Sequence, residues 1–137
     1  MHFHIDIVSL KGTIYSGEIQ KITLPSLEGD MTVLSRHMPI VAPLGVGEVL
    51  VNTPNGTLNM SIGKGVFEFS KGRARLLIED VTSSDDISEQ NVLEAKKRAE
   101  ELLEKGIVGE EKLQAMYALR KSFVDLKIVR RRKRKIV

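Results

Sequence analysis

The 137-residue sequence contains no cysteine and no tryptophan, and aromatic residues make up only 4% of it. The lack of cysteine excludes disulfide bonds, thiolate metal sites and cysteine nucleophiles, and it suits a reducing compartment. With so few aromatic rings, a hydrophobic core must consist mainly of aliphatic side chains. A chain of this length is expected to form one compact domain, or a small domain with an appendage.

The sequence also has no long apolar run. No stretch approaches the roughly 18–20 apolar residues that are needed to cross a bilayer. Residues Met1 to Asp6 contain no basic segment followed by an apolar core, so no signal peptide is expected. These features predict a soluble intracellular protein, which can still sit beside a membrane as part of a larger assembly.

Positive charge is concentrated at one end of the chain. The net charge is +3, but it would be −3 without the six consecutive cations of residues 130–135. Three interpretations of this run remain open: a solvated flexible end, a segment that docks on an acidic protein surface, and a nucleic-acid contact. The nucleic-acid interpretation is the least favoured, because the run has no interleaved aromatic residues and follows no recognisable nucleic-acid motif.

Residues 3–81 have the pattern of short strands separated by turns. Apolar and β-branched residues alternate with polar ones, and Ser16-Gly17, Glu28-Gly29-Asp30 and Pro54-Asn55-Gly56 are expected to be turns. Gly63-Lys64-Gly65 and Ser70-Lys71-Gly72 have the same character. Asn55-Gly56 is the strongest hairpin signal, since both residues tolerate positive φ. Many short strands without intervening helices predict an antiparallel sandwich or barrel.

The pattern changes after the polar linker Thr82–Asp86. The spacing predicts a first helix over 88–105, capped by Ser88 or Asp86 and ended by Gly106. A second helix is expected over about 110–127, and the short link between the two folds them into an antiparallel hairpin. The inner face of the first helix is expected to carry Val92, Ala95, Ala99 and Leu102. The apolar stripe of the second is expected to carry Leu113, Met116, Leu119 or Arg120, Phe123 and Leu126.

The sequence therefore predicts an α+β protein with a β-domain over 1–84 and a helical domain over 85–137. Two helices bury limited area, and most helical stability comes from tertiary packing. The hairpin should depend on docking against the β-domain or a partner, which makes it a plausible moving part.

No constellation of residues predicts catalysis or a cofactor. His2, His4 and Asp6 share one face of the first strand and can in principle bind a metal, but a solvated strand is the favoured interpretation. His37 has no evident nucleophile partner, and the serines lack the nucleophile-elbow spacing. The lysine of Gly63-Lys64-Gly65 is misplaced for a phosphate loop. We expect no catalytic residue, no metal and no cofactor.

Several segments, taken in order, resemble one known family. They are Asp6–Ser9 with Ile14–Glu18, Leu24–Leu34, Arg36–Val41, Leu44–Val49, Ile62–Phe67 and Glu94–Glu100. Their order and spacing are similar to those of the epsilon subunits of F-type ATP synthases, with the "LP…EG" turn, the "GHAP" loop and the "sGGf" hairpin. Arg36 and Lys64 replace glycines of that pattern.

The resemblance implies a fold and a set of partners. The fold is an antiparallel β-sandwich of about ten strands followed by an antiparallel two-helix hairpin. The partners are the gamma subunit, the c-ring and the alpha/beta catalytic hexamer, and the membrane is contacted only through the complex. The family's turns at the ring-facing end of the sandwich correspond to Glu28, Gly29, Asp30, Met31 and His37, which are the expected c-ring contacts. The implied location is the cytoplasmic face of the bacterial cell membrane.

The resemblance also implies a brake on ATP hydrolysis. When extended beside gamma, the helices would reach the hexamer, where cations meet an acidic segment of beta. Such pairing strengthens in a partly desolvated interface and weakens with salt. The expected contacts are Arg120, Lys121, Lys127, Arg130, Arg131, Arg132, Lys133, Arg134 and Lys135.

Two further expectations concern ligands. Some bacterial members bind ATP through an "(I/L)DxxRA" motif, but this chain has Ser88 and Asn91 in place of its aspartate and arginine. We therefore predict no physiologically useful ATP binding, although Arg98 matches a further basic position. The alternative function is a nucleic-acid-binding adaptor that uses the basic tail, but this accounts for only six residues.

Overall fold

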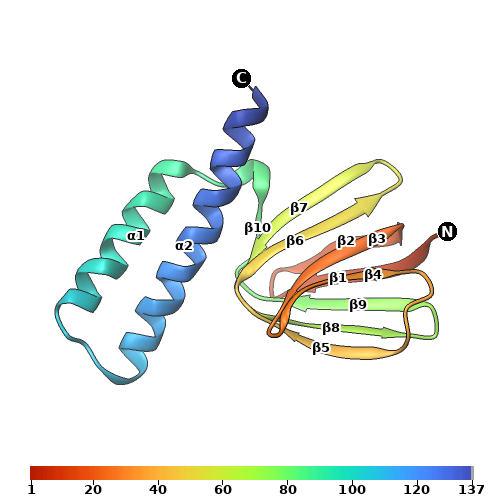
Figure 1. Ribbon diagram of the computed structural model, residues 1–137, viewed down its shortest axis with the longest axis horizontal. Helices are drawn as coiled ribbons and strands as arrows, with labels where there is room; N and C mark the ends of the chain where they lie inside the picture. Colours follow the sequence, from red (N-terminus) through yellow and green to blue (C-terminus); the bar gives the residue numbers. More distant parts are fainter. Residues whose placement is uncertain (137) are drawn as a thin grey trace. The chain divides into compact units, whose positions relative to one another are not determined.

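The computed structural model describes the backbone of residues 1–136 and the side chains of residues 1–132. The chain divides into two compact units, Met1–Ser83 and Ser84–Val137, and each is described by itself. The elements are β1 (Phe3–Ser9), β2 (Gly12–Ile19), β3 (Lys21–Ser26), β4 (Gly29–Leu34), β5 (Ile40–Leu44), β6 (Gly47–Thr53), β7 (Gly56–Ile62), β8 (Gly65–Ser70), β9 (Arg73–Ile78), β10 (Thr82–Ser83), the 3₁₀ turn η1 (Ser84–Asp86), α1 (Glu89–Glu104) and α2 (Gly109–Ile136) (Figure 1).

The first unit is one ten-stranded sheet that curls around a single core. The strand order is β10-β7-β6-β3-β5-β8-β9-β1-β2, and β4 pairs with β3. Strand β3 holds the two halves together, because it pairs with β6 near Lys21 and with β5 at Ser26. The pairing within residues 1–83 is antiparallel apart from β1 and β9, which run parallel. The predicted fold class is confirmed, with this parallel pair as an addition.

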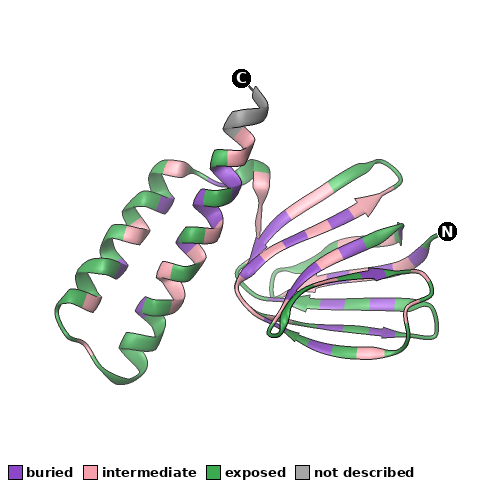
Figure 2. Ribbon diagram, in the orientation of Figure 1, coloured by how far each residue is buried: buried purple, intermediate pink, exposed green. Residues whose placement is uncertain are grey.

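The core of the sheet is mainly aliphatic, as the shortage of aromatics predicts. Buried and exposed residues alternate along β6, β8 and β9, so each strand turns one face inward (Figure 2). The largest fully buried side chain is Phe67, and Phe3 meets Phe69 edge-to-face with ring centroids 5.4 Å apart. Burial of apolar surface contributes roughly 25 cal/mol per Å², so this cluster is the main source of the sheet's stability.

Four of the five predicted turns lie between strands, at Glu28, Asn55, Gly63-Lys64 and Lys71-Gly72, and the fifth is wrong. Pro54-Asn55 connects β6 and β7 as predicted, and Gly56 opens β7 with φ of +128° while its carbonyl accepts a hydrogen bond from Thr53 Oγ1 at 2.8 Å. Ser16 and Gly17, in contrast, lie inside β2, opposite Asp6 and Ile5. The Tyr15 ring folds over Gly17, and its hydroxyl donates to the Glu18 carbonyl oxygen at 2.9 Å. This glycine therefore makes room for a ring and does not form a turn.

In the second unit, α1 begins and ends where the sequence predicts. The Ser88 hydroxyl accepts the Asn91 backbone N–H at 3.3 Å, which caps the first turn. Gly106 has φ of +75°, the left-handed conformation that commonly ends a helix.

The second helix is longer than predicted. Helix α2 continues nine residues beyond Lys127, through the basic run to Ile136. Lys and Arg are good helix formers, and cations near a helix C-terminus interact favourably with the macrodipole. The backbone of the basic run is helical as far as Ile136, which the sequence did not predict.

Helix α1 buries the face predicted for it, whereas α2 mostly does not. The prediction was right for Val92, Ala99 and Leu126, which are buried, but Leu102, Leu113, Met116 and Phe123 are exposed. Ala115, Ser122 and Asp125 are buried instead, so small and polar residues occupy positions where large apolar ones were expected. Over the described residues, neither helix has a stretch long and apolar enough to cross a membrane.

Candidate functional site

The β3–β4 turn presents four of the five predicted c-ring contacts together. The Ser26 hydroxyl accepts the Glu28 backbone N–H at 3.3 Å and donates to the Gly29 carbonyl oxygen at 2.5 Å, which fixes the turn. Glu28 and Asp30 are exposed, and Met31 is half-buried against the core. Gly29 has φ of +122°, a conformation that a side chain would strain. The turn is a small, rigid, acidic protrusion.

His37 is not part of this protrusion. It lies beyond the other end of β4, where its backbone N–H donates to the Leu34 carbonyl oxygen at 3.0 Å. Its ring lies 6.2 Å from the Phe69 ring, and Nδ1 is 2.7 Å from the Met38 carbonyl oxygen. Since a strand rises about 3.3 Å per residue, the six residues of β4 separate His37 from the turn by roughly 20 Å. The structure does not bring the five residues to one end.

The predicted hexamer-contacting cations fall into three groups. Arg120, Lys127 and Arg130 are exposed on α2, and Arg131 is half-buried. Lys121 and Arg132 are engaged within the helical unit. The side chains of Lys133, Arg134 and Lys135 lie outside the described residues.

Lys121 and Asp125 form an ion pair within α2. The Lys121 ammonium is 3.3 Å from Asp125 Oδ1, and each side chain is only 13% exposed. A charge in such a position is tolerated because its partner is adjacent, so the pair holds two polar side chains in the hairpin interior.

A cationic groove lies between the two helices. It has a volume of about 450 Å³ and is lined by Lys96, Phe123, Leu126, Lys127, Arg130 and Arg131. Lys96 of α1 stands over the Phe123 ring at 5.4 Å from its centroid, which is a cation–π contact across the hairpin. This arrangement suits an acidic partner, with one aromatic ring at its floor.

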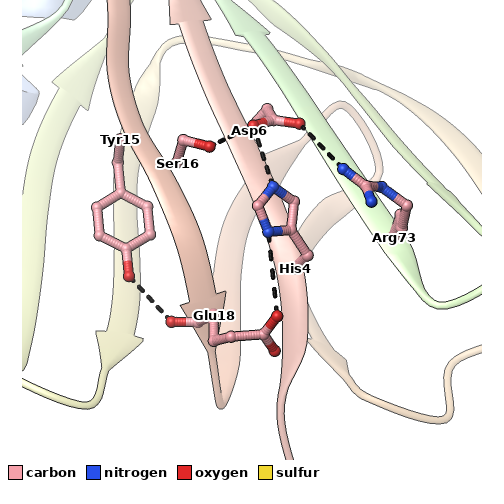
Figure 3. Close-up of polar contacts among 6 residues, drawn as sticks. All are labelled: His4, Asp6, Tyr15, Ser16, Glu18 and Arg73. Carbon is pink, nitrogen blue, oxygen red and sulfur yellow. Dashed lines mark hydrogen bonds and ion pairs between the residues drawn. The ribbon is translucent and has the colours of Figure 1, made fainter.

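The outer face of β1, β2 and β9 carries a polar network of His4, Asp6, Ser16, Glu18 and Arg73 (Figure 3). Ser16 Oγ donates to Asp6 Oδ1 at 2.6 Å, and His4 Nε2 lies 3.1 Å from the same oxygen. Arg73 is 3.9 Å from Asp6 Oδ2, and His4 Nδ1 is 4.0 Å from Glu18. The pKa of Asp6 is lowered. The hydrogen bond from Ser16 is the largest cause, followed by the hydrogen bond with His4 and then by nearby positive charge.

This network accounts for the alternating histidine and aspartate in the first strand. His4 and Asp6 share a face as predicted, and their partners come from β2 and β9. Among the described side chains, no group of three His, Asp or Glu residues is placed to hold a metal ion.

The same outer face ends in an apolar row that sequence reasoning missed. Cross-strand pairing aligns four residues, one each from β1, β5, β8 and β9: Val8, Pro43, Val66 and Leu77. Val66 and Leu77 are 38% and 45% exposed, and Val41 of β5 is 68% exposed two residues away. An open hollow of about 560 Å³ lies beside the row. The signal was present in the sequence, since Leu77 breaks the alternation of β9.

The residues at the altered ATP motif have local structural roles. Ile87 is buried in a cluster with Val92, Leu126, Ile128 and Val129, and Ser88 is the cap of α1. Arg98 is exposed on α1. The absence of useful ATP binding stays a prediction.

Comparison with known proteins identifies the family. Residues 2–84 match the family model described as ATP synthase, Delta/Epsilon chain, beta-sandwich domain. The chain is 32% identical over 133 residues to the ATP synthase epsilon chain of Alkalilimnicola ehrlichii, covering 96% of this chain and 95% of that one. It is 36% identical over 104 residues to ATP synthase epsilon chain 1 of Methylococcus capsulatus, covering 75% and 74%.

Solved structures support the fold. A chain of the mitochondrial ATP synthase of Euglena gracilis superposes with a TM-score of 0.76 at 19% identity, over 87% of this chain and 76% of that one. A chain of the central stalk and c-ring assembly of Tetrahymena thermophila mitochondrial ATP synthase gives 0.54 at 10% identity, over 61% and 68%. The curated relatives carry the assignment: this chain belongs to the ATP synthase epsilon-chain family and is a non-catalytic subunit.

Proposed function

We propose that this chain is a central-stalk subunit of a proton-translocating F-type ATP synthase. It couples rotation between the c-ring and the catalytic hexamer, and its helical unit restrains ATP hydrolysis. The observation that supports this most strongly is the alignment with an epsilon chain over 95% of that protein, sheet and helices included. As a peripheral subunit it would lie at the cytoplasmic face of the bacterial cell membrane, held there by the complex.

The apolar row is the proposed anchor on gamma. The apolar row is continuous across four paired strands. Contiguous apolar residues at the surface of a protein commonly mark an interaction site. The polar network beside it supplies a charged rim, as is usual around the apolar centre of an interface. Such a row suits a permanent contact with a stalk subunit.

The β3–β4 turn is the proposed contact with the c-ring. Its exposed carboxylates, Glu28 and Asp30, can pair with cations in the ring loops, and its serine-fixed backbone loses little freedom on binding. His37 lies at the opposite end of β4 from this turn. It is therefore proposed as a separate contact with the c-ring.

The helical unit is the proposed brake. Its buried residues are five apolar ones in one cluster together with small and polar ones, so separating the helices costs less than opening the larger core of the sheet. Extension of the hairpin would carry the exposed cations Arg120, Lys127 and Arg130 to the acidic segment of beta. Lys121 and Arg132 would have to leave their present partners before they could join that contact.

Two charge substitutions in the apolar row test its proposed contact with gamma. Val66→Glu combined with Leu77→Glu should weaken binding to a cognate alpha–beta–gamma core at least tenfold, because it buries carboxylates in an apolar contact. Thr57→Glu, which adds one carboxylate at an exposed position of β7, is the control and should leave the affinity unchanged. Surface plasmon resonance measures the affinity of wild-type, the double variant and the control. Equal affinities for all three would show that the apolar row is not part of the interface.

Neutralising cations tests the brake. Lys127→Gln with Arg130→Gln should reduce the inhibition of ATP hydrolysis by the bound subunit, and should flatten its dependence on salt. Lys105→Gln with Lys112→Gln, near the turn of the hairpin, removes the same charge as a control. An inhibition that responds equally to both pairs would reflect net charge alone and would contradict a specific contact.

A further inference from the structure

Arg132 makes a contact that ties the end of the second helix to the linker before the first. Its guanidinium donates to the carbonyl oxygen of Ser84 at 2.5 Å and to that of Ile87 at 3.1 Å. These residues are 48 and 45 positions away in the sequence, yet both belong to the helical unit. One side chain therefore bridges the two chain segments at the open end of the hairpin.

The two carbonyls are suited to this contact. Ser84 begins η1 and Ile87 precedes the Ser88 cap, and the first turn of α1 uses the Ser88 hydroxyl and the Ser88 carbonyl to bind the N–H groups of Asn91 and Val92. The Ile87 carbonyl thus remains available for another donor. Arginine offers a rigid fork of N–H groups that can reach two acceptors at once, which lysine cannot do equally well.

Ile87 links the contact to the packing beneath it. Its carbonyl binds Arg132 while its side chain is buried in the cluster with Val92, Leu126, Ile128 and Val129. Releasing the guanidinium would remove the hydrogen bond that holds the backbone of this buried linker residue. The opposite end of the hairpin is closed covalently by the short turn after Glu104, so the open end is where separation of the helices would begin.

We propose that Arg132 is the latch of the closed hairpin and sets how often it opens. This inference rests on the proposed braking function for its biological consequence, but not for its structural content. In the closed state Arg132 joins the end of α2 to the linker before α1. The exposed Arg130, two residues earlier, lines the groove between the helices and belongs to the surface offered to a partner.

The latch and the contact surface predict opposite effects on the brake. Removing a cation that only contacts the hexamer weakens inhibition. Removing the latch raises the population of open hairpin, and so strengthens inhibition even though one positive charge is lost. Arg132→Gln and Arg130→Gln remove the same charge from the same helix and should therefore change inhibition in opposite directions.

Hydrogen exchange on the full-length chain tests the latch directly. Charge-assisted hydrogen bonds are among the stronger ones, so Arg132→Gln should lower the protection of the Asn91 and Val92 amides by about tenfold. Arg130→Gln should leave it unchanged, and Arg132→Lys should fall between, since the ammonium keeps the charge but not the fork. Equal protection in Arg132→Gln and Arg130→Gln would overturn the proposal.

ATP hydrolysis by the assembled complex then separates the latch from the brake. Faster exchange together with stronger inhibition in Arg132→Gln supports both. Faster exchange without any inhibition by wild-type or variant supports the latch and contradicts the proposed braking function. Faster exchange with weaker inhibition than wild-type, matching Arg130→Gln, contradicts the latch as the controlling element of the brake.

Discussion

The two units of this chain are stabilised in different ways. The sheet surrounds seventeen buried apolar residues in one cluster, with Phe67, Ile5 and Leu24 among those fully removed from solvent. The main cluster of the helical unit has five, and Ser122 and Asp125 are buried in the same unit. The sheet also has many long-range backbone hydrogen bonds, whereas a helix satisfies its own. The sheet is therefore suited to the proposed anchor, and the helical unit to the proposed part that rearranges.

This difference fits the two functions proposed for the chain, coupling of rotation by the sheet and restraint of ATP hydrolysis by the helices. A rotary stalk needs a rigid attachment, and a brake needs an element with two states that differ by a few kcal/mol. Local opening is easiest where few apolar contacts must be broken. The hairpin meets that condition, since it exposes Leu113, Met116 and Phe123 while burying small and polar side chains.

The largest expected effect comes from truncating the centre of the sheet. Phe67→Ala should lower the free energy of unfolding by about 3–5 kcal/mol, because it removes a fully buried ring and leaves a cavity. Urea denaturation followed by circular dichroism measures it. Glu68→Ala, the exposed neighbour on β8, should change stability by less than about 0.5 kcal/mol. A small loss for Phe67→Ala would mean that the sheet is not the rigid unit.

Leu126→Ala should have a smaller and more local effect. It removes a buried side chain from the five-residue cluster, at a cost of about 2–3 kcal/mol to hairpin closure. Hydrogen exchange should then rise in α1 and α2 while the amides of β8 and β9 keep their protection. Uniform loss of protection in both units would show that they unfold together. It would contradict the difference in stability between the sheet and the helical unit.

Gly106→Ala should destabilise the turn of the hairpin by about 1 kcal/mol. Its φ of +75° is a left-handed conformation that alanine adopts with strain. Nothing lies within 4 Å of a side chain added there, so the cost is conformational and not steric. Thermal unfolding of the variant measures it, with Ser70→Ala at the end of β8 as a control. An unchanged transition for Gly106→Ala would contradict this account of the helix end.

The smallest effect expected is a pH dependence in the polar network. Because the pKa of Asp6 is lowered in the folded state, its ionised form contributes stability above the ordinary aspartate pKa of about 3.9, and this is lost as pH falls through the lowered value. Asp6→Asn should therefore be less stable than wild-type at pH 7 and approach it at pH 3. Urea midpoints at the two pH values test this, and a constant difference would contradict it.

Much of the fold follows from the sequence because its signals are local. Periodicity gave the boundary between strands and helices, Ser88 and Gly106 gave the limits of α1, and Asn55-Gly56 gave a hairpin. Strand β5 was not anticipated, since Pro43 lies within it. Its carbonyl accepts the Leu27 N–H, and the strand pairs with β8 across the sheet, which only tertiary structure determines.

The candidate surfaces were harder to predict, for a related reason. The exposed stripe of α2 looked like its buried face, because Leu113, Met116 and Phe123 are the larger apolar residues. The structure instead buries Ala115, Ser122 and Asp125 of α2, and the predicted Ala99 of α1. The apolar row depends on register across four strands, and the Arg132 contact joins residues more than forty apart. Neither is visible in a local window.

The most direct test of an anchored sheet with a mobile brake compares the full chain with residues 1–84 on a purified cognate alpha–beta–gamma core, following binding and ATP hydrolysis together. The account predicts similar affinity for both proteins, with hydrolysis slowed only by the full chain. Slowing of hydrolysis by residues 1–84 alone, or failure of that fragment to bind when the full chain does, would contradict it.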